Sequence, residues 1–119
     1  MTAPVVSVII PTRNRPTLVT RAVASALNQP GQSVEVVVVI DGPDSATVAA
    51  LSVVAEPRLR VIELAERSGG ARARNVGIEA ARGKWVAFLD DDDEWLPHKL
   101  EKQLACAAQS PARYPVVSG

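Results

Sequence analysis

Four short apolar runs, each rich in β-branched residues, alternate along this chain with stretches of helical periodicity. The runs cover residues 5–10, 34–40, 59–64 and 85–89, and we predict helices over 16–27, 45–55, 68–83 and 96–109. This alternation is typical of a parallel sheet whose strands are joined by right-handed helical crossovers. The predicted fold class is therefore α/β: a Rossmann-like three-layer sandwich with a mainly parallel sheet.

A length of 119 residues suits one domain, residues 1–119, and is near the lower limit for an open α/β sheet. Residues 114–117 look like the opening of a fifth strand, so we expect the fold to be truncated there. A sheet cut at this strand would leave an unpaired edge, which is a known route to association between molecules. We therefore expect self-association through this edge.

The composition argues against several classes of protein. The 13 basic and 13 acidic residues balance, so no net field draws the chain to nucleic acid or to a membrane. The single cysteine, Cys106, allows no internal disulfide and fits a reducing compartment, and the presence of only one histidine and one cysteine argues against a zinc site. With neither an export signal nor a membrane span in the sequence, we expect a cytoplasmic location, with the inner face of the membrane as the alternative.

Five consecutive acids, Asp90–Glu94, follow the last apolar run. Carboxylates about 5 Å apart repel by roughly 3 kcal/mol at an effective dielectric of about 20, so water or a bound cation must offset the repulsion. In an extended chain Asp90 and Asp92 point the same way, and oxygen-only ligands favour Mg²⁺ or Mn²⁺. The plainer interpretation is a solvated loop, in which Asp93 and Glu94 favour the dipole of the next helix.

A glycine- and arginine-rich segment, residues 67–77, opens the third predicted helix. Free backbone N–H groups and the positive end of the dipole form an anion site at such a position, and Arg72 and Arg74 add charges suited to phosphate. The alternative is a simple turn followed by a solvated helix. An anion site opposite the acidic run would suit a metal-bound diphosphate. The segment is neither a Rossmann glycine motif nor a P-loop.

Two further polar loops, residues 11–15 and 41–44, follow the first and second strands. Ligands of open parallel sheets bind beyond the carboxyl ends of the strands, so these loops are expected to meet the acidic run. Asp41 could accept a hydrogen bond from a base or a ribose hydroxyl, or belong to an ordinary Asp-Gly-Pro turn. Thr12 and Arg13 could line a nucleotide pocket or cap the next helix.

Taken together, four segments resemble family 2 glycosyltransferases: VSVIIPTRNR at 6–15, EVVVVIDG at 35–42, GGARARNVG at 69–77 and FLDDDDEWLP at 88–97. The resemblance implies a GT-A fold that binds a nucleoside-diphosphate sugar, usually a UDP-sugar, with Mn²⁺ or Mg²⁺. The first acid of the run is expected near the ribose and a later one on the metal. The implied nucleotide-sugar-binding residues are Pro11, Thr12, Arg13, Asp41, Arg74, Asp90 and Asp91, and the implied metal ligands are Asp92 and Asp90.

Two departures from the family pattern limit what the resemblance implies. Ile40 replaces the first of two acids that the family commonly has after its second strand, which affects the choice of base. The general base is expected beyond Gly119, so no catalytic residue is assigned within the chain.

The predicted function is the donor-binding domain of a metal-dependent inverting glycosyltransferase, acting on a glycan, lipid or protein acceptor. The alternative is a non-catalytic module that binds a nucleotide-sugar or a partner subunit. Two other classes fit less well. A receiver domain needs acids after the first and third strands, whereas here they follow the second and fourth. A nucleotidyltransferase needs a glycine-rich loop after the first strand, where this chain has Pro-Thr-Arg-Asn.

Overall fold

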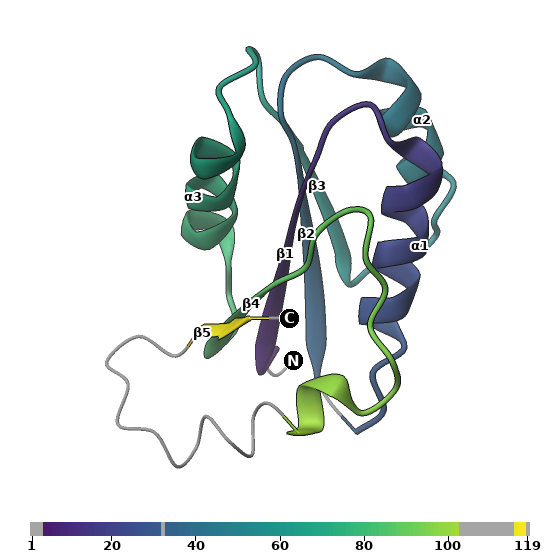
Figure 1. The fold of residues 1–119 in the computed structure, drawn as a ribbon, viewed down its shortest axis with the longest axis vertical. Coiled ribbons are helices and arrows are strands. Elements are labelled where there is room, and N and C mark those ends of the chain that lie inside the picture. The colour runs from purple at the N-terminus through teal and green to yellow at the C-terminus, as the bar shows by residue number, and fades with distance from the viewer. Residues whose placement is uncertain (1–3, 32, 103–115, 119) are drawn as a thin grey trace.

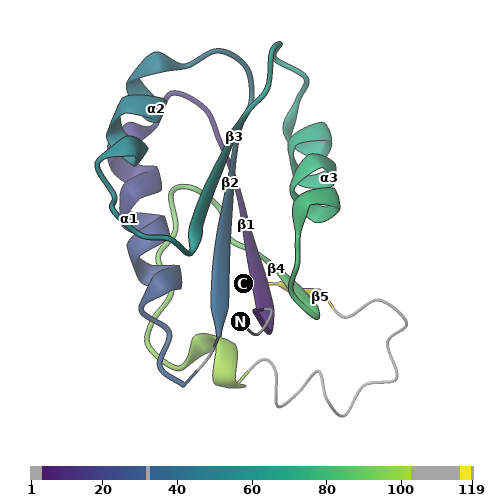
Figure 2. The same cartoon turned by 180° about the vertical axis from the view of Figure 1, so that it is seen from behind.

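The computed structural model describes residues 4–31, 33–102 and 116–118. Within these residues five parallel strands form one sheet in the order β3-β2-β1-β4-β5. The strands are β1 (Val6–Thr12), β2 (Val34–Ile40), β3 (Leu59–Glu63), β4 (Trp85–Phe88) and β5 (Val116–Ser118). Helices α1 (Pro16–Leu27) and α2 (Ser45–Ser52) cover one face and α3 (Gly70–Ala80) covers the other (Figure 1, Figure 2). The predicted three-layer α/β sandwich is confirmed.

The two central strands are buried on both faces, as their apolar sequences predict. Alternate residues of β1 serve opposite layers: Val8 and Ile10 belong to the core under α1, whereas Ile9 belongs to the core under α3. β1 continues two residues past the predicted end at Ile10. Pro11 is tolerated because β4 pairs only with 6–9, so at Pro11 the strand has β2 as its one neighbour in the sheet.

Helix α1 has the predicted bounds, with a proline in its first turn and an apolar face that is buried against the sheet. α2 ends at Ser52 instead of Ala55, because the N–H groups of Val54 and Glu56 bond to the carbonyls of Leu51 and Val54 and the chain turns there. α3 ends at Ala80, three residues before the predicted end near Gly83, because Ala81 is extended. These differences shorten the helices without changing their order.

Helix α3 lies unusually close to the central strand. A Cβ atom built on Gly77 would be 2.4 Å from Cγ2 of Ile9, and one built on Gly83 would be 2.7 Å from the backbone nitrogen of Ser7. Both distances are shorter than any real carbon contact, so only glycine fits at these positions. The close approach sets the distance between α3 and β1.

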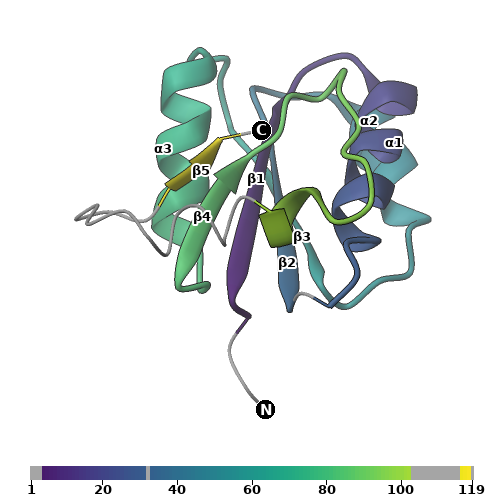
Figure 3. The same ribbon diagram turned by 60° about the horizontal axis from the view of Figure 1, so that its bottom comes forward.

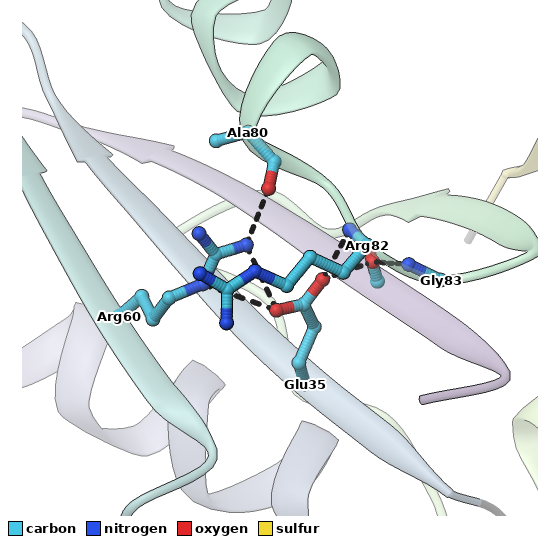
Figure 4. Close-up of polar contacts among 6 residues, drawn as sticks. Glu35, Arg60, Ala80, Arg82 and Gly83 are labelled. Atoms are coloured by element: carbon cyan, nitrogen blue, oxygen red, sulfur yellow. Dashed lines mark hydrogen bonds and ion pairs between the residues drawn. The ribbon is translucent and has the colours of Figure 1, made fainter. Parts of the chain in front are cut away.

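A buried polar network joins the C-terminal end of α3 to the sheet (Figure 4). Glu35 accepts hydrogen bonds from the Ser7 hydroxyl (2.5 Å), the Arg82 N–H (2.6 Å) and Arg60 (2.8 Å). Arg60 also donates to the carbonyl of Ala80. Burial alone would raise the pKa of Glu35, but these hydrogen bonds together outweigh it and lower the pKa below its ordinary value. The helix end is therefore held by a charged carboxylate.

The segment after β4 differs most from the prediction. Helical backbone begins at Lys99, not at Leu96, because His98 has a φ of 69° that no right-handed helix can contain. Leu100 is buried, whereas Leu96, at the predicted start of the helix, is 77% exposed. The rest of the predicted helix to Gln109 lies outside the described residues.

The predicted fifth strand is present, with described bounds of Val116–Ser118 instead of 114–117, and it pairs in parallel with β4 (Figure 3). Within the described ranges, the helices are all too short or too polar to cross a bilayer.

Candidate functional site

A charged cleft of about 630 Å³ lies at the carboxyl ends of β1, β2 and β4. The three polar loops predicted to converge do meet here, together with the first turns of α3. All the nucleotide-sugar and metal ligands that the family resemblance implies line this cleft, but Arg72, the other arginine expected to bind phosphate, does not. Its lining consists of Pro11, Thr12, Arg13, Asn14, Arg15, Asp41, Arg67, Gly70, Ala73, Arg74, Asp90, Asp91 and Asp92.

The acids form a tight turn. The strand ends at Phe88, so the argument that Asp90 and Asp92 share a side of an extended chain does not apply. The Asp93 N–H instead donates to the carbonyl of Asp90 (3.1 Å), and the turn brings carboxylate oxygens of Asp90, Asp92 and Asp93 within 4.8 Å of one another. Three exposed carboxylates at this spacing fit a hard cation such as Mg²⁺ or Mn²⁺, which takes oxygen ligands and keeps several waters.

Asp93 was predicted to serve the dipole of the following helix, and this interpretation is wrong. The helix begins only at Lys99, six residues later, whereas the Asp93 carboxylate lies beside those of Asp90 and Asp92. In an extended chain, side chains alternate between the two sides, so that pattern pairs Asp90 with Asp92 and leaves out Asp93. The turn geometry that includes it is a tertiary feature.

Asp91 differs from its neighbours because its carboxylate is turned into the protein. It accepts hydrogen bonds from the Thr12 hydroxyl (2.8 Å) and from Arg15 Nη1 (3.0 Å), and the residue is 9% exposed. Asp91 thus ties the acidic turn to the loop after β1. Its predicted contact with a nucleotide stays a prediction.

Arg15 was not among the predicted site residues. Its Nη1 atom lies 3.0 Å from Asp91 and 3.6 Å from Asp92, and its side chain is 48% exposed at the rim of the cleft. The sequence Arg13-Asn14-Arg15 does not reveal which of the two arginines faces the acids. The contact depends on how the loop turns at Asn14, which has a φ of 54°.

The turn at Asn14 is held by the loop after β2. Asp44 accepts the Asn14 N–H (2.7 Å) and also caps α2 through the Thr47 hydroxyl (2.6 Å) and the Thr47 N–H (3.2 Å). The hydrogen bond from the Thr47 side chain is the main cause of a pKa for Asp44 below its usual value. An ionised Asp44 therefore fixes the direction in which Arg13 and Arg15 leave the loop.

Asp41 holds the turn that opens α3. Its carboxylate accepts the Ser68 N–H (2.6 Å) and the Gly69 N–H (3.0 Å), and Gly69 has a φ of 95° that favours glycine. A carboxylate has about four acceptor positions, so two N–H donors leave room for a ligand. Gly42 supports the same turn, since a Cβ there would be 3.0 Å from the backbone nitrogen of Arg67.

Positive charge faces the acids across the cleft. The N-terminal turn of α3 presents Gly70, and Arg74 Nη2 lies 4.0 Å from Asp90 Oδ1. Arg67, which was not assigned to the site, also lines the cleft, whereas Arg72 does not and is exposed. The cleft therefore combines a cluster of oxygen ligands with an anion site of the kind that helix N-termini provide.

The segment after the acidic turn is fastened to α1. The Gln29 side chain is buried; it donates to the Leu96 carbonyl (2.9 Å) and accepts the Leu100 N–H (3.0 Å). The Ser25 hydroxyl accepts the Trp95 N–H (3.0 Å), and Arg21 pairs with Glu94. Trp95 is buried in the core. The acidic turn is therefore fastened at its C-terminal side.

A parallel sheet with a charged cleft at the carboxyl ends of its strands is the architecture in which open α/β proteins bind their ligands. The sequence matches Glycosyl transferase family 2 over residues 7–118. The succinoglycan biosynthesis protein ExoO of Rhizobium meliloti (strain 1021) is 41% identical over 113 residues, which are 95% of this chain and 32% of that protein.

Two solved structures agree with this match. TarS of S. aureus, residues 1–349, has a TM-score of 0.74 at 31% identity, covering 87% of this chain and 32% of that one. Mannosyltransferase PcManGT of Pyrobaculum calidifontis, in complex with GDP-Man and Mn²⁺, has a TM-score of 0.74 at 29% identity, covering 92% and 34%.

The chain belongs to glycosyl transferase family 2 and has the GT-A fold. It spans about a third of the length of these relatives.

Proposed function

We propose that this chain is the donor-binding part of a metal-dependent inverting glycosyltransferase. One observation carries the proposal: three carboxylates within 4.8 Å of one another lie across a single cleft from the N-terminus of α3 and Arg74. A nucleoside-diphosphate sugar carries its negative charge on the diphosphate, which suits that pairing of a cation site with an anion site.

Asp90, Asp92 and Asp93 would hold the cation, Mn²⁺ or Mg²⁺. A divalent ion at this position supplies electrostatic stabilisation of the charge that develops on the departing diphosphate. Arg74 and the free N–H groups at the start of α3 add fixed positive charge beside it. Arg67 lines the same side of the cleft and increases this charge.

The nucleotide would lie along the loops after β1 and β2. Pro11, Thr12 and Arg13 line this end of the cleft, and Asp41 retains acceptor capacity for a base N–H or a ribose hydroxyl. Asp91 acts here through Thr12, whose position it fixes. UDP is the expected nucleotide, and GDP is the competing one because the similar mannosyltransferase is in complex with GDP-Man.

The transfer itself needs groups that the resemblance places beyond Gly119. A carboxylate base there would deprotonate an acceptor hydroxyl of a glycan, lipid or protein, and in-line attack would invert the anomeric centre. A cytoplasmic location and self-association through the β5 edge remain parts of the proposal. Light scattering tests the association, and a monomer at high concentration would contradict it.

Calorimetric titration tests the donor site directly. UDP, GDP and dTDP are titrated into the chain with and without Mn²⁺, and then into Asp92→Ala and Asp93→Ala. We expect Mn²⁺-dependent binding of one nucleotide that both variants lose, with Glu79→Ala, an exposed acid of α3, as the matched control. Unchanged binding in Asp92→Ala would contradict the metal site. Binding without transfer when the complete enzyme is assayed would favour the non-catalytic module.

A further inference from the structure

Arg15 supplies a positive charge inside the cluster of acids. A single nitrogen of its guanidinium lies between two carboxylates, 3.0 Å from Asp91 and 3.6 Å from Asp92. The two contacts differ in environment: the side chain of Asp91 is 12% exposed, whereas that of Asp92 is 56% exposed. The contact with Asp91 therefore anchors the arginine, and the contact with Asp92 is the looser one.

Asp92 is shared between this arginine and the candidate cation site. Its carboxylate belongs to the cluster with Asp90 and Asp93, so a divalent ion there would approach the Arg15 guanidinium closely. Two positive charges near one carboxylate repel, and the attraction of Asp92 for each is reduced by the other. Arg15 consequently opposes binding of the cation alone.

A diphosphate reverses the sign of this effect. Arg15 lines the same cleft as Arg74 and the start of α3, and a guanidinium is well suited to phosphate oxygens. With a diphosphate in the cleft, the negative charge of its phosphates lies near both the cation and Arg15. Arg15 therefore stabilises the bound cation when a diphosphate is present, although it destabilises the cation bound alone.

We propose that Arg15 couples the two ligands, weakening the binding of a divalent cation alone and strengthening the binding of the cation together with a nucleoside diphosphate. This inference rests on the proposed function and adds to it a residue that couples its two ligands energetically. It makes the cation and the nucleotide bind with positive cooperativity, which is reciprocal by linkage.

The test uses the Arg15→Gln variant and measures Mn²⁺ binding without any transfer assay. Free Mn²⁺ is quantified from its EPR signal, with and without saturating UDP, and then GDP. In the unaltered chain the nucleotide should tighten Mn²⁺ binding by about fivefold or more. In Arg15→Gln, Mn²⁺ alone should bind more tightly than in the unaltered chain, and the effect of the nucleotide should fall.

Two variants separate this role from simpler ones. Arg21→Gln removes an arginine that pairs with the acidic segment outside the cleft, at Glu94, and should change neither measurement. Arg15→Lys keeps the charge and should leave the affinity for Mn²⁺ alone close to that of the unaltered chain. Thermal melts followed by circular dichroism show that each variant is folded.

The outcomes are distinct. Weaker binding of Mn²⁺ alone by folded Arg15→Gln would mean that Arg15 only supports the turn, and it would overturn the inference while leaving the proposed function intact. If Arg15→Gln changes neither the affinity for Mn²⁺ alone nor the effect of the nucleotide on it, the inference is likewise overturned and the proposed function is left intact. If the unaltered chain binds neither Mn²⁺ nor a nucleotide, both the proposed function and the inference fail.

Discussion

Thr12 and Asp91 are 79 residues apart in the sequence, and the Thr12 hydroxyl donates a 2.8 Å hydrogen bond to the Asp91 carboxylate. Both residues are buried. The bond joins the end of β1 to the acidic turn after β4, and so connects two walls of the cleft.

The first prediction concerns this bond. Thr12→Val keeps the shape of the side chain and removes the donor, leaving part of a buried carboxylate unsatisfied. We expect a loss of about 1–3 kcal/mol in the free energy of unfolding and weaker Mn²⁺-dependent nucleotide binding. Urea denaturation and calorimetry measure the two effects. Thr20→Val, which removes a hydroxyl that bonds within α1 at the surface, should change neither.

The second prediction concerns the packing of α3. Gly77→Ala places a methyl group 2.4 Å from Cγ2 of Ile9, so the helix must move away from the sheet. Overpacking of this kind costs about 1–3 kcal/mol, which urea denaturation measures. Glu79→Ala on the exposed side of the same helix should stay within about 0.5 kcal/mol. A Gly77→Ala protein as stable as the unaltered chain would show that the helix is less closely packed.

The third prediction is a pH dependence. The pKa of Glu35 is lowered in the folded state, so its stabilising effect is fully present above the unfolded pKa of about 4.3 and is lost as the pH falls through the folded pKa. Glu35→Gln should lower stability at pH 7 by about 1.5–3 kcal/mol, because Arg60 loses its charged partner.

The difference between Glu35→Gln and the unaltered chain should shrink as the pH falls below the unfolded value. Thermal melts from pH 7 to 3 follow this difference, with Glu79→Gln as the control. A constant difference across the range would rule out a titrating Glu35 as its source.

The fourth prediction concerns the segment that follows the acidic turn. Gln29→Ala leaves the Leu96 carbonyl and the Leu100 N–H without the partner that Gln29 provides, at a cost of about 1–3 kcal/mol for a buried unsatisfied group. Amide hydrogen exchange should rise in residues 94–100 before it rises in the sheet. Asn28→Ala, at the exposed neighbouring position, should leave the exchange pattern unchanged.

The order of strands and helices could be predicted from the sequence because it depends on local periodicity. Each buried strand shows a run of apolar residues, and the loops at the carboxyl ends of parallel strands must lie at one edge of the sheet. The polar loops could therefore be assigned to one cleft, and the resemblance to family 2 glycosyltransferases then selected Pro11, Thr12, Arg13, Asp41, Arg74 and Asp90–Asp92. The bounds of the elements were harder to predict, since the backbone conformation of one residue, such as His98, can move the start of a helix by several positions.

The pairing of charges inside the cleft was decided by the tertiary structure alone. Four successive aspartates look alike in a sequence, yet Asp91 turns toward Thr12 and Arg15 while Asp93 joins Asp90 and Asp92. Glu35 likewise stands within an apolar strand, and only the approach of Arg60 and the end of α3 explains why its charge is buried there. The sequence determined which loops reach the cleft, because periodicity and strand direction are local properties. Their partners depend on distances between loops that are far apart along the chain, and those distances exist only after folding.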